Sequence, residues 1–402
     1  MDNPFIIQRD IQYGEPFCDR EEETERFLKA ARMGESICLI SPRRYGKTSL
    51  LNQVAGKLKE QGWLTAKIDF MQALSDIELA KEVERTRLNL LGTWRRAIQK
   101  LGKSVQSLKK TKIDVEFEDL HFSMGLGGLD ETNGRTLLKG SLSRLRELPE
   151  KTGMPLMVYL DEFQRVREID PKGNLEAMIR TAFQKRTRKF LPMYLGSRRH
   201  MLQMMFADKS TPLFKSATLL SLDTIQTDRF TSFASQQFKQ TIKSQFTANL
   251  ATAMGRFYKG HPHLLNKTAA LIWDMCLRDK IKKVSKDICR RAIFEIIREE
   301  ADAFLEVNRK TPIHHMTVLR QIAVRGTVSK PYSSEFLRAC NLTQSQMQKI
   351  IDALVSDDRI YRDDTGVHIV DPLEGLALRM IGSSPEWRME MINTLLEEAY
   401  LG

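Results

Sequence analysis

The segment SPRRYGKTS, at residues 41–49, places a lysine and hydroxyl side chains beside a glycine. It matches the phosphate-loop pattern G-x-x-x-x-G-K-[ST], except that Ser41 replaces the first glycine. In such a loop, backbone N–H groups surround phosphate oxygens, and Gly46 keeps their approach free of a side chain. We expect Lys47 to bridge the β- and γ-phosphates and the Thr48 hydroxyl to bind Mg²⁺. The residues expected to contact the nucleotide are Ser41, Pro42, Arg43, Arg44, Tyr45, Gly46, Lys47, Thr48 and Ser49.

The residues on either side of this loop have the pattern that phosphate binding requires. ICLIS, at 37–41, is a short apolar run typical of a strand, and leucine and valine recur at helical spacing between residues 50 and 58. A helix that begins near Lys47 would point the positive end of its dipole at the phosphates. The alternative is an ordinary basic turn, which this order of strand, loop and helix disfavours.

An acidic pair follows the apolar run LMVYL at residues 156–160. Asp161 would stand at the carboxyl end of a buried strand, where it can hold the hydration shell of Mg²⁺, and Glu162 could activate the attacking water. Alone, such a run often marks only a strand end that meets solvent. Because a phosphate loop lies upstream, we predict catalytic roles for Lys47, Asp161 and Glu162 and Mg²⁺ binding by Thr48 and Asp161.

A third polar group ends the apolar run FLPMYLG at residues 190–196. Ser197 or Arg198 would emerge beside the γ-phosphate and could sense whether that phosphate is present. Alternatively, Arg198 and Arg199 cap or solvate the following helix. The sequence does not choose among these three residues.

The apolar runs predict strands, and helical stretches separate them. This alternation predicts an α/β fold, a parallel-sheet P-loop NTPase core with right-handed crossovers. An excursion of about 85 residues between the second and third strands must contain structure of its own. We predict a basic helix near 76–102 and a hairpin at 112–128 there. The predicted strands are residues 37–41, 64–70, 155–163, 190–197 and 217–225.

The rest of the chain reads as helices from Asp228 to about Lys310. After Pro312 the order becomes helix, helix, helix and hairpin, with the turn at Asp364-Thr365-Gly366, which predicts a winged helix. The predicted domains are a P-loop core at residues 1–227 with an insertion at about 72–130, a helical lid at 228–310, and a winged helix with C-terminal helices at 311–402.

Charge is uneven along the 402 residues, whose formal net charge is +12. Residues 81–112 contain ten basic and two acidic side chains, and residues 180–200 contain seven basic side chains and no acidic one. Such segments could neutralise nucleic-acid phosphates, although solvated helix faces are the alternative. The predicted winged helix, at 313–372, holds seven basic and seven acidic residues, so direct reading of a duplex by it is disfavoured.

Cysteine, histidine and hydropathy patterns disfavour several classes. Cysteines 18, 38, 276, 289 and 340 lie far apart, so free buried thiols are expected rather than disulfides or zinc ligands. His261 and His263 would point to different sides of a helix, a poor metal chelate. The chain has no apolar stretch of about 18 residues or more and no secretory signal pattern, so we expect a cytoplasmic protein with no membrane partner.

Five segments together resemble a known family: FCDREEETERFL, ISPRRYGKTSLL, YLDEFQ, GSRRHMLQMMF and GHPHLL. They are similar to the archaeal and bacterial ATPase branch of the signal-transducing AAA+ relatives, often called STAND ATPases. The resemblance covers roughly residues 15–372. It implies ATP and Mg²⁺ as ligands, a helical lid and a C-terminal winged helix.

The resemblance also implies roles for single residues. Asp19 and Arg20 would lie in the box near the adenine, although many relatives have glycine where Asp19 stands. Pro262 would match the lid proline of the family's G-x-P motif, which packs near the adenine. The Walker A residues would be Lys47 and Thr48, the Walker B residues Asp161 and Glu162, and the sensor 1 position Ser197 and Arg198.

The function that these features favour is an ATP-binding and hydrolysing switch that acts on or near nucleic acid. The alternative is a nucleotide-controlled switch that docks a protein partner or associates with itself, with no direct DNA contact. A metabolic kinase would need a small-substrate site and a lid of catalytic arginines, whereas a helical unit and a winged helix are expected here.

Overall fold

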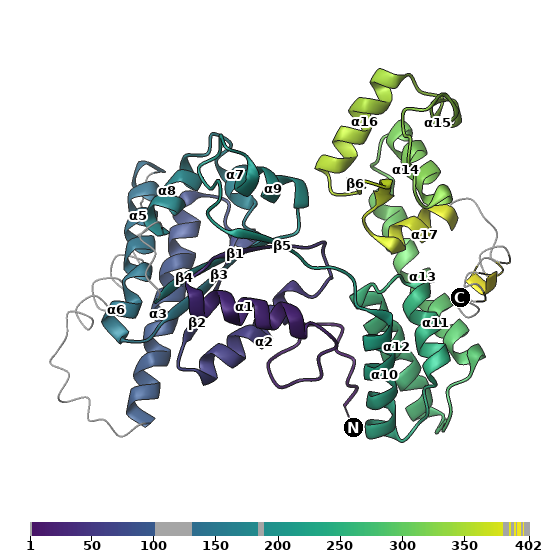
Figure 1. The fold of residues 1–402 in the computed structure, drawn as a ribbon, viewed down its shortest axis with the longest axis horizontal. Coiled ribbons are helices and arrows are strands. Elements are labelled where there is room, and N and C mark those ends of the chain that lie inside the picture. Colours follow the sequence, from purple (N-terminus) through teal and green to yellow (C-terminus); the bar gives the residue numbers. More distant parts are fainter. Residues whose placement is uncertain are drawn as a thin grey trace. The chain divides into compact units, whose positions relative to one another are not determined.

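The computed structural model describes residues 2–100, 131–183 and 189–380, and the positions 386, 390, 392–394 and 397. The chain forms two compact units (Figure 1). The sheet unit contains Glu22–Ile40 and Leu50–Ser221, and the helical unit contains Met1–Glu21, Ser41–Ser49 and Leu222–Gly402. The predicted hairpin at 112–128 lies outside the described residues, and the predicted domain limits stay predictions.

The sheet unit is built on five parallel strands, all at predicted places, in the order β2-β3-β4-β1-β5. Because β4 lies between β3 and β1, the carboxyl ends of these three neighbours share one edge of the sheet. The strands are β1 (Ile37–Ile40), β2 (Leu64–Asp69), β3 (Leu156–Asp161), β4 (Phe190–Gly196) and β5 (Thr218–Ser221).

Burial explains why these runs form strands. Every residue of β1, β3 and β4 is buried, as expected for central parallel strands covered on both faces. The edge strand β2 alternates between buried and half-buried residues, so its polar Lys67 and Asp69 are half-buried. The predicted α/β core is thus confirmed.

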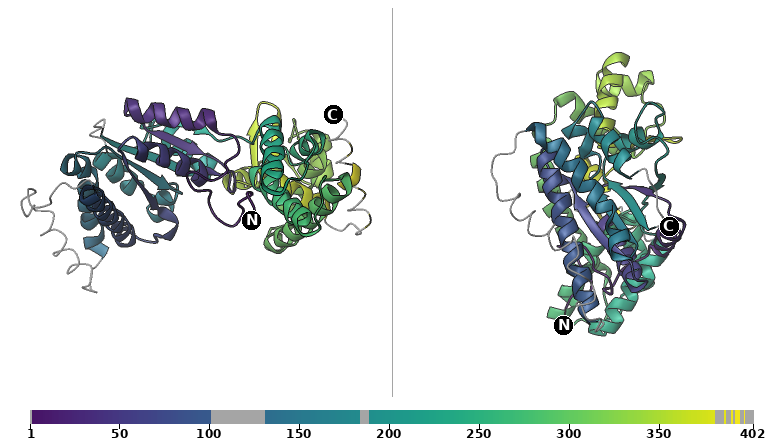
Figure 2. Two further views of the ribbon diagram at one scale, coloured as in Figure 1. Left: turned by 90° about the horizontal axis from the view of Figure 1, so that it is seen from below. Right: turned by 90° about the vertical axis from the view of Figure 1, so that its left-hand side faces the viewer.

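Helices cover both faces of this sheet. Helices α1 (Glu21–Met33) and α2 (Lys47–Glu60) lie across the sheet from α3 (Asp76–Lys100), α5 (Glu131–Arg146) and α8 (Asn174–Phe183) (Figures 1 and 2). Helix α3 is the predicted basic helix, and it contributes buried leucine and valine to the main core. Shorter helices are η1 (Phe70–Gln72), α6 (Leu148–Thr152), α7 (Arg165–Ile169) and α9 (Arg199–Ala207).

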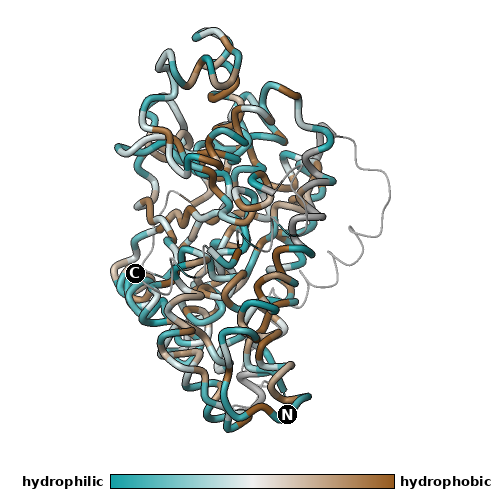
Figure 3. Tube along the Cα trace, turned by 90° about the vertical axis from the view of Figure 1, so that its right-hand side faces the viewer, coloured by the Kyte–Doolittle hydropathy of each residue, from teal (hydrophilic) through white to brown (hydrophobic). Residues whose placement is uncertain are grey.

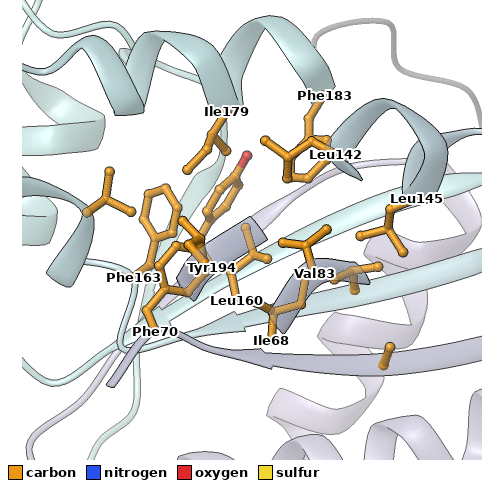
Figure 4. Close-up of a cluster of buried hydrophobic side chains, with 14 of the residues drawn as sticks. Ile68, Phe70, Val83, Leu142, Leu145, Leu160, Phe163, Ile179, Phe183 and Tyr194 are labelled. Carbon is orange, nitrogen blue, oxygen red and sulfur yellow. The ribbon is translucent and has the colours of Figure 1, made fainter. Parts of the chain in front are cut away.

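The core of the sheet unit anchors the residue that follows Glu162. Phe163 is fully buried, and its ring centroid lies 4.8 Å from that of Tyr194 and 5.5 Å from that of Phe70. Figure 4 shows these rings beside Leu160 and Ile179. The Phe163 N–H also donates to the carbonyl of Leu195 at 2.8 Å. The turn after β3 is therefore fixed by packing and by the backbone.

The helical unit has a second core, around Trp273 and the buried Phe230 and Phe238. Hydrophobic and hydrophilic segments alternate along the helices in Figure 3, as expected for helices with one buried face. The helices around this core are α10 (Thr227–Ile242), α11 (Ala248–Phe257), α12 (Pro262–Arg278) and α13 (Lys286–Asn308).

The order of elements after Pro312 is the predicted one. A hairpin follows three helices, its turn lies at Asp364-Thr365, and a bridge from Val328 to Val367 extends it. These elements share a third core. They are α14 (Ile313–Arg325), α15 (Ser334–Cys340), α16 (Gln344–Ser356), β6 (Ile360–Asp363) and β7 (Gly366–Ile369), followed by α17 (Pro372–Met380).

All five cysteines are buried free thiols, which confirms the expectation. Burial raises the pKa of Cys18 and of Cys289 to about 12 each. Among the described helices, none combines the length and the hydropathy that crossing a membrane requires.

Candidate nucleotide site

The predicted phosphate loop follows β1 directly and ends where α2 begins, at Lys47. Arg44 and Gly46 adopt φ values of 66° and 85°, in the left-handed region. Ser41 is not among the residues with positive φ, so this position does not need glycine for its backbone. Ser41 is fully buried, and its hydroxyl donates to the carbonyl of Pro42 at 3.1 Å. Its departure from the pattern is therefore compatible with a phosphate loop.

The Lys47 ammonium lies over the loop. It donates to the carbonyl of Ser41 at 3.1 Å and to that of Pro42 at 3.5 Å, and the residue is buried. Thr48, half-buried, is the second residue of α2, where its hydroxyl can reach a ligand at the helix N-terminus. Lys47 and Thr48 are thus the first two residues of α2, and their roles toward a nucleotide stay predictions.

The remaining loop residues differ in exposure. Arg43 and Arg44 are exposed and Pro42 is half-buried, whereas Tyr45 and Ser49 are buried. The Ser49 hydroxyl accepts the N–H of Ile11 at 3.0 Å, which ties the N-terminal segment to the loop. Ser49 therefore also has a structural task that the sequence did not reveal.

The acidic pair after β3 has defined partners. The Asp161 carboxylate lies 2.7 Å from the ammonium of Lys67, on the neighbouring strand β2. Glu162 adopts φ 51°, an unfavourable value for a residue with a side chain, and such strain is commonest at functional sites. Its carboxylate accepts a 2.7 Å hydrogen bond from the hydroxyl of Ser197. The structure therefore brings Glu162 and Ser197 into contact, and their roles toward a nucleotide stay predictions.

The geometry distinguishes the three residues that the sequence could not rank. Ser197 follows β4 and touches Glu162, whereas the Arg198 guanidinium lies 3.1 Å from the carboxylate of Glu168. Arg198 precedes α9 and makes no side-chain cap hydrogen bond, and Arg199 is the first residue of that helix. Ser197 thus contacts Glu162, the second residue of the acidic pair.

The residues of the predicted adenine box have unusual backbones. Asp19 and Arg20 adopt φ values of 65° and 81°, in the region that glycine prefers. The Asp19 carboxylate accepts the N–H of Gln226 at 3.3 Å, and the buried Arg20 guanidinium donates to the carbonyl of Asp223. These bonds hold Asp19 in a conformation that glycine would adopt more easily.

Pro262 is the first residue of α12, and the residue before it contacts the phosphate loop. The His261 ring lies 5.0 Å from the ring of Tyr45, edge to face, and its Nδ1 accepts the N–H of Leu264 as a helix cap. No sequence pattern predicts this contact, because it joins residues far apart in the sequence. Lys67 is not predictable either, because a lysine within a strand carries no distinctive signal.

The first basic segment does not present all of its charges to solvent. Arg87 is only 1% exposed, and its guanidinium lies 2.5 Å from the carboxylate of Glu84. A phosphate-contacting role is therefore wrong for Arg87, because its position faces the core and needs a buried partner. Lys81 and Arg96 are exposed, and a phosphate-contacting role for them stays a prediction.

The second basic segment is described only in part, since residues 184–188 lie outside the described residues. The Arg180 guanidinium donates to the carbonyl of Pro212, which holds it against the loop after α9. Lys189 and His200 are exposed. Among the described residues of this segment, Arg180 is therefore less available to a phosphate than its charge alone suggested.

No protein-family model matches the sequence, and no curated protein matches it. Solved structures do match. The Walker-type ATPase PABY2304 of Pyrococcus abyssi is similar, with a TM-score of 0.66 and 21% identity over 94% of this chain and 99% of that one. The Aeropyrum pernix ORC2 protein, in ADPNP-ADP complexes, has a TM-score of 0.57 and 14% identity over 100% of this chain and 98% of that one.

Identities of this size show the fold alone. Both likenesses extend over nearly the full length of each chain, so they include the sheet and the helical region. With its parallel five-stranded sheet and surrounding helices, the chain has the fold of an AAA+ P-loop NTPase.

Proposed function

We propose that the chain is a Mg²⁺-dependent ATPase that works as a nucleotide-controlled switch in a DNA-associated process. The carrying observation is the edge at which three neighbouring strands end. There β1 leads into the phosphate loop, β4 into Ser197, and β3 into Asp161 and Glu162. Groups that bind phosphate, sense it and activate water thus follow adjacent strands.

The residues fit a magnesium nucleotide by their chemistry. Mg²⁺ prefers oxygen ligands and keeps several waters, and the Thr48 hydroxyl and the Asp161 carboxylate supply such oxygens. Because Asp161 is paired with Lys67, we expect it to hold a metal-bound water rather than the ion itself. When bound, Mg²⁺ would neutralise charge on the phosphate oxygens.

The protein's own groups would then divide the work. The loop N–H groups and the Lys47 ammonium hold the phosphates, and the dipole of α2 favours their charge. The Glu162 carboxylate accepts the proton of the attacking water. Ser197, which already donates to Glu162, orients that carboxylate beside the transferred phosphate.

A contact between the loop and α12 supports the switch. Tyr45 belongs to the phosphate loop, and His261 caps the N-terminus of α12. The His261 Nε2 also lies 4.0 Å from the carboxylate of Asp371, just before α17. A nucleotide that moves Tyr45 would therefore alter the packing of His261, and through it the start of two helices.

The DNA-associated role draws on the charge of the sheet unit and on the C-terminal elements, which we interpret as a winged helix. Lys81 and Arg96 are exposed on α3, and each could neutralise a phosphate. An AAA+ core joined to a winged helix is a common arrangement in DNA-handling proteins. This support is an analogy of fold.

The second candidate function is a switch that docks a protein partner or another copy of the chain. One observation favours it: α16 carries a single lysine, the exposed Lys349, and its exposed aspartate is paired. There Asp352 accepts hydrogen bonds from Gln348 at 2.8 and 2.9 Å and lies 3.5 Å from Arg362 of the hairpin. A face with this balance suits a protein partner better than a duplex.

ATP hydrolysis, measured with and without single- and double-stranded DNA at two salt concentrations, separates the two. Contacts with a polyanion weaken steeply with salt. We expect hydrolysis that a chelator of Mg²⁺ stops and that DNA stimulates more at low salt. Hydrolysis that is indifferent to DNA would favour the protein-docking switch, and no hydrolysis under any condition would contradict the ATPase.

A further inference from the structure

Gln164 is a buried amide beside the acidic pair. The residue is 2% exposed, and its Nε2 donates to Oε2 of Glu162 at 2.5 Å. It precedes α7, where a polar side chain usually caps the helix, yet it makes no cap hydrogen bond. Its amide is therefore committed to the Glu162 carboxylate and not to the helix that it starts.

The carbonyl oxygen of this amide, Oε1, packs against Gly196. The Oε1 atom of Gln164 is buried and has no hydrogen-bond partner in the part of the chain that the structure describes. A Cβ on Gly196 would lie 1.9 Å from this oxygen, so only glycine leaves room for it. An unpaired buried carbonyl destabilises a protein, and such groups call for an explanation.

Two neighbours act on the same carboxylate oxygen. Oε2 of Glu162 accepts from Nε2 of Gln164, from the hydroxyl of Ser197 at 2.7 Å and from its N–H at 3.3 Å. Donors that converge on one oxygen restrict the orientation of the carboxylate. The backbone of Glu162 is itself fixed in a strained conformation, with φ 51°.

We infer that Gln164 is a positioning residue for the water-activating carboxylate of Glu162, seated against Gly196. This inference rests on the proposed ATPase function. The amide keeps the Glu162 carboxylate directed toward the water, and Gly196 keeps the amide in place. The unpaired Oε1 destabilises the folded protein, and we infer that this loss is tolerated because the same amide places Nε2 against the Glu162 carboxylate.

The test compares ATP hydrolysis and ATP affinity in the full-length wild type and three variants. In Gln164→Leu the donor is lost, and we expect kcat to fall about tenfold or more, since a hydrogen bond to a charged group is worth roughly 1.5–3 kcal/mol. ATP affinity should change less than about twofold, because no phosphate contact is removed. Gly196→Ala should lower kcat in the same way. Gly92→Ala is the matched control, since a Cβ there meets nothing within 4 Å.

Comparing kcat with ATP affinity distinguishes positioning from a merely structural role. Loss of positioning should lower kcat alone, whereas a purely structural defect would lower kcat, ATP affinity and melting temperature together.

The outcomes separate the two claims. If the wild type hydrolyses ATP, Lys47→Ala does not, and Gln164→Leu keeps its wild-type kcat, the role of Gln164 is overturned while the ATPase stands. The role is likewise overturned if kcat, ATP affinity and melting temperature all fall together in Gln164→Leu. A wild type without hydrolysis overturns the ATPase and, with it, the role of Gln164.

Discussion

Several side chains at the candidate site are fixed by short polar contacts with other protein groups. The Lys47 ammonium lies against the carbonyl oxygens of its own loop, and Asp161 is paired with Lys67. The Glu162 carboxylate accepts hydrogen bonds from Gln164 and from Ser197. Such preorganisation lowers the reorganisation needed when a reaction develops charge, so each contact is a testable part of the account.

Ser197→Ala tests the contact between β4 and the acidic pair. We expect kcat for ATP hydrolysis to fall about tenfold or more, because a charge-assisted hydrogen bond to Glu162 is lost. Arg198→Ala is the matched control, and we expect less than about a twofold change, since an exposed ion pair with Glu168 contributes little. Steady-state hydrolysis at saturating ATP measures both. A larger effect of Arg198→Ala would make that arginine the sensor.

At the scale of elements, one residue both caps α12 and contacts the phosphate loop. The His261 side chain caps the helix and packs against Tyr45. Ser333 caps α15 in a comparable way, through its hydroxyl and the N–H of Phe336, but its helix belongs to the core of the C-terminal elements. The two caps therefore form a matched pair.

We expect His261→Ala to weaken ATP binding several-fold and to lower the melting temperature. The lost cap destabilises by about 1 kcal/mol, and the lost packing against Tyr45 loosens the loop. Ser333→Ala should lower the melting temperature similarly and leave the Kd for ATP unchanged. Titration with a fluorescent ATP analogue, beside thermal unfolding, measures both effects. Equal ATP affinities in the two variants would refute a link between α12 and the loop.

The elements themselves were predictable because their signals are local. Apolar runs marked each strand, and the periodicity of apolar residues marked α2 and α3. Contacts between side chains on different elements were not predictable in this way. Lys67 meets Asp161 only because β2 pairs with β3 in a register that sets Lys67 opposite Tyr159 and Asp69 opposite Asp161.

The contacts of Arg87 and Gln164 were not predictable for the same reason. Arg87 counts as a positive charge in the sequence, yet its place on the buried face of α3 commits it to Glu84. Gln164 acquires its role from the close approach of Gly196, on a strand distant in the sequence. By contrast, Lys47, Thr48, Asp161 and Glu162 were predictable, because each is defined by its place at the end of a strand or the start of a helix.

At the scale of the whole molecule, charge separates the two candidate functions. The excess of basic residues lies before residue 313, whereas the C-terminal elements are balanced. Direct duplex recognition would require cations on α16, and its exposed Asp352 is instead paired with Arg362. If DNA binds, we therefore expect the basic insertion to contact it.

Charge reversal to Glu at Arg95, Arg96, Lys109 and Lys110 should weaken DNA binding at least about tenfold near 0.1 M salt and flatten its salt dependence. Changes at Gln346 and Lys349 of α16 should have less effect, under about twofold. Binding of a labelled duplex at several salt concentrations measures both sets. The opposite ranking would place the DNA contact on the C-terminal elements.

The central claim is that Lys47 binds the phosphates of ATP and Glu162 activates the water that hydrolyses it. The most direct measurement follows ATP binding and hydrolysis side by side in the wild type, Lys47→Ala and Glu162→Gln. We expect Lys47→Ala to lose ATP binding, and Glu162→Gln to bind ATP normally while hydrolysis slows by about a hundredfold or more, trapping the triphosphate-bound state. A Glu162→Gln protein that hydrolyses ATP at the wild-type rate would contradict the account.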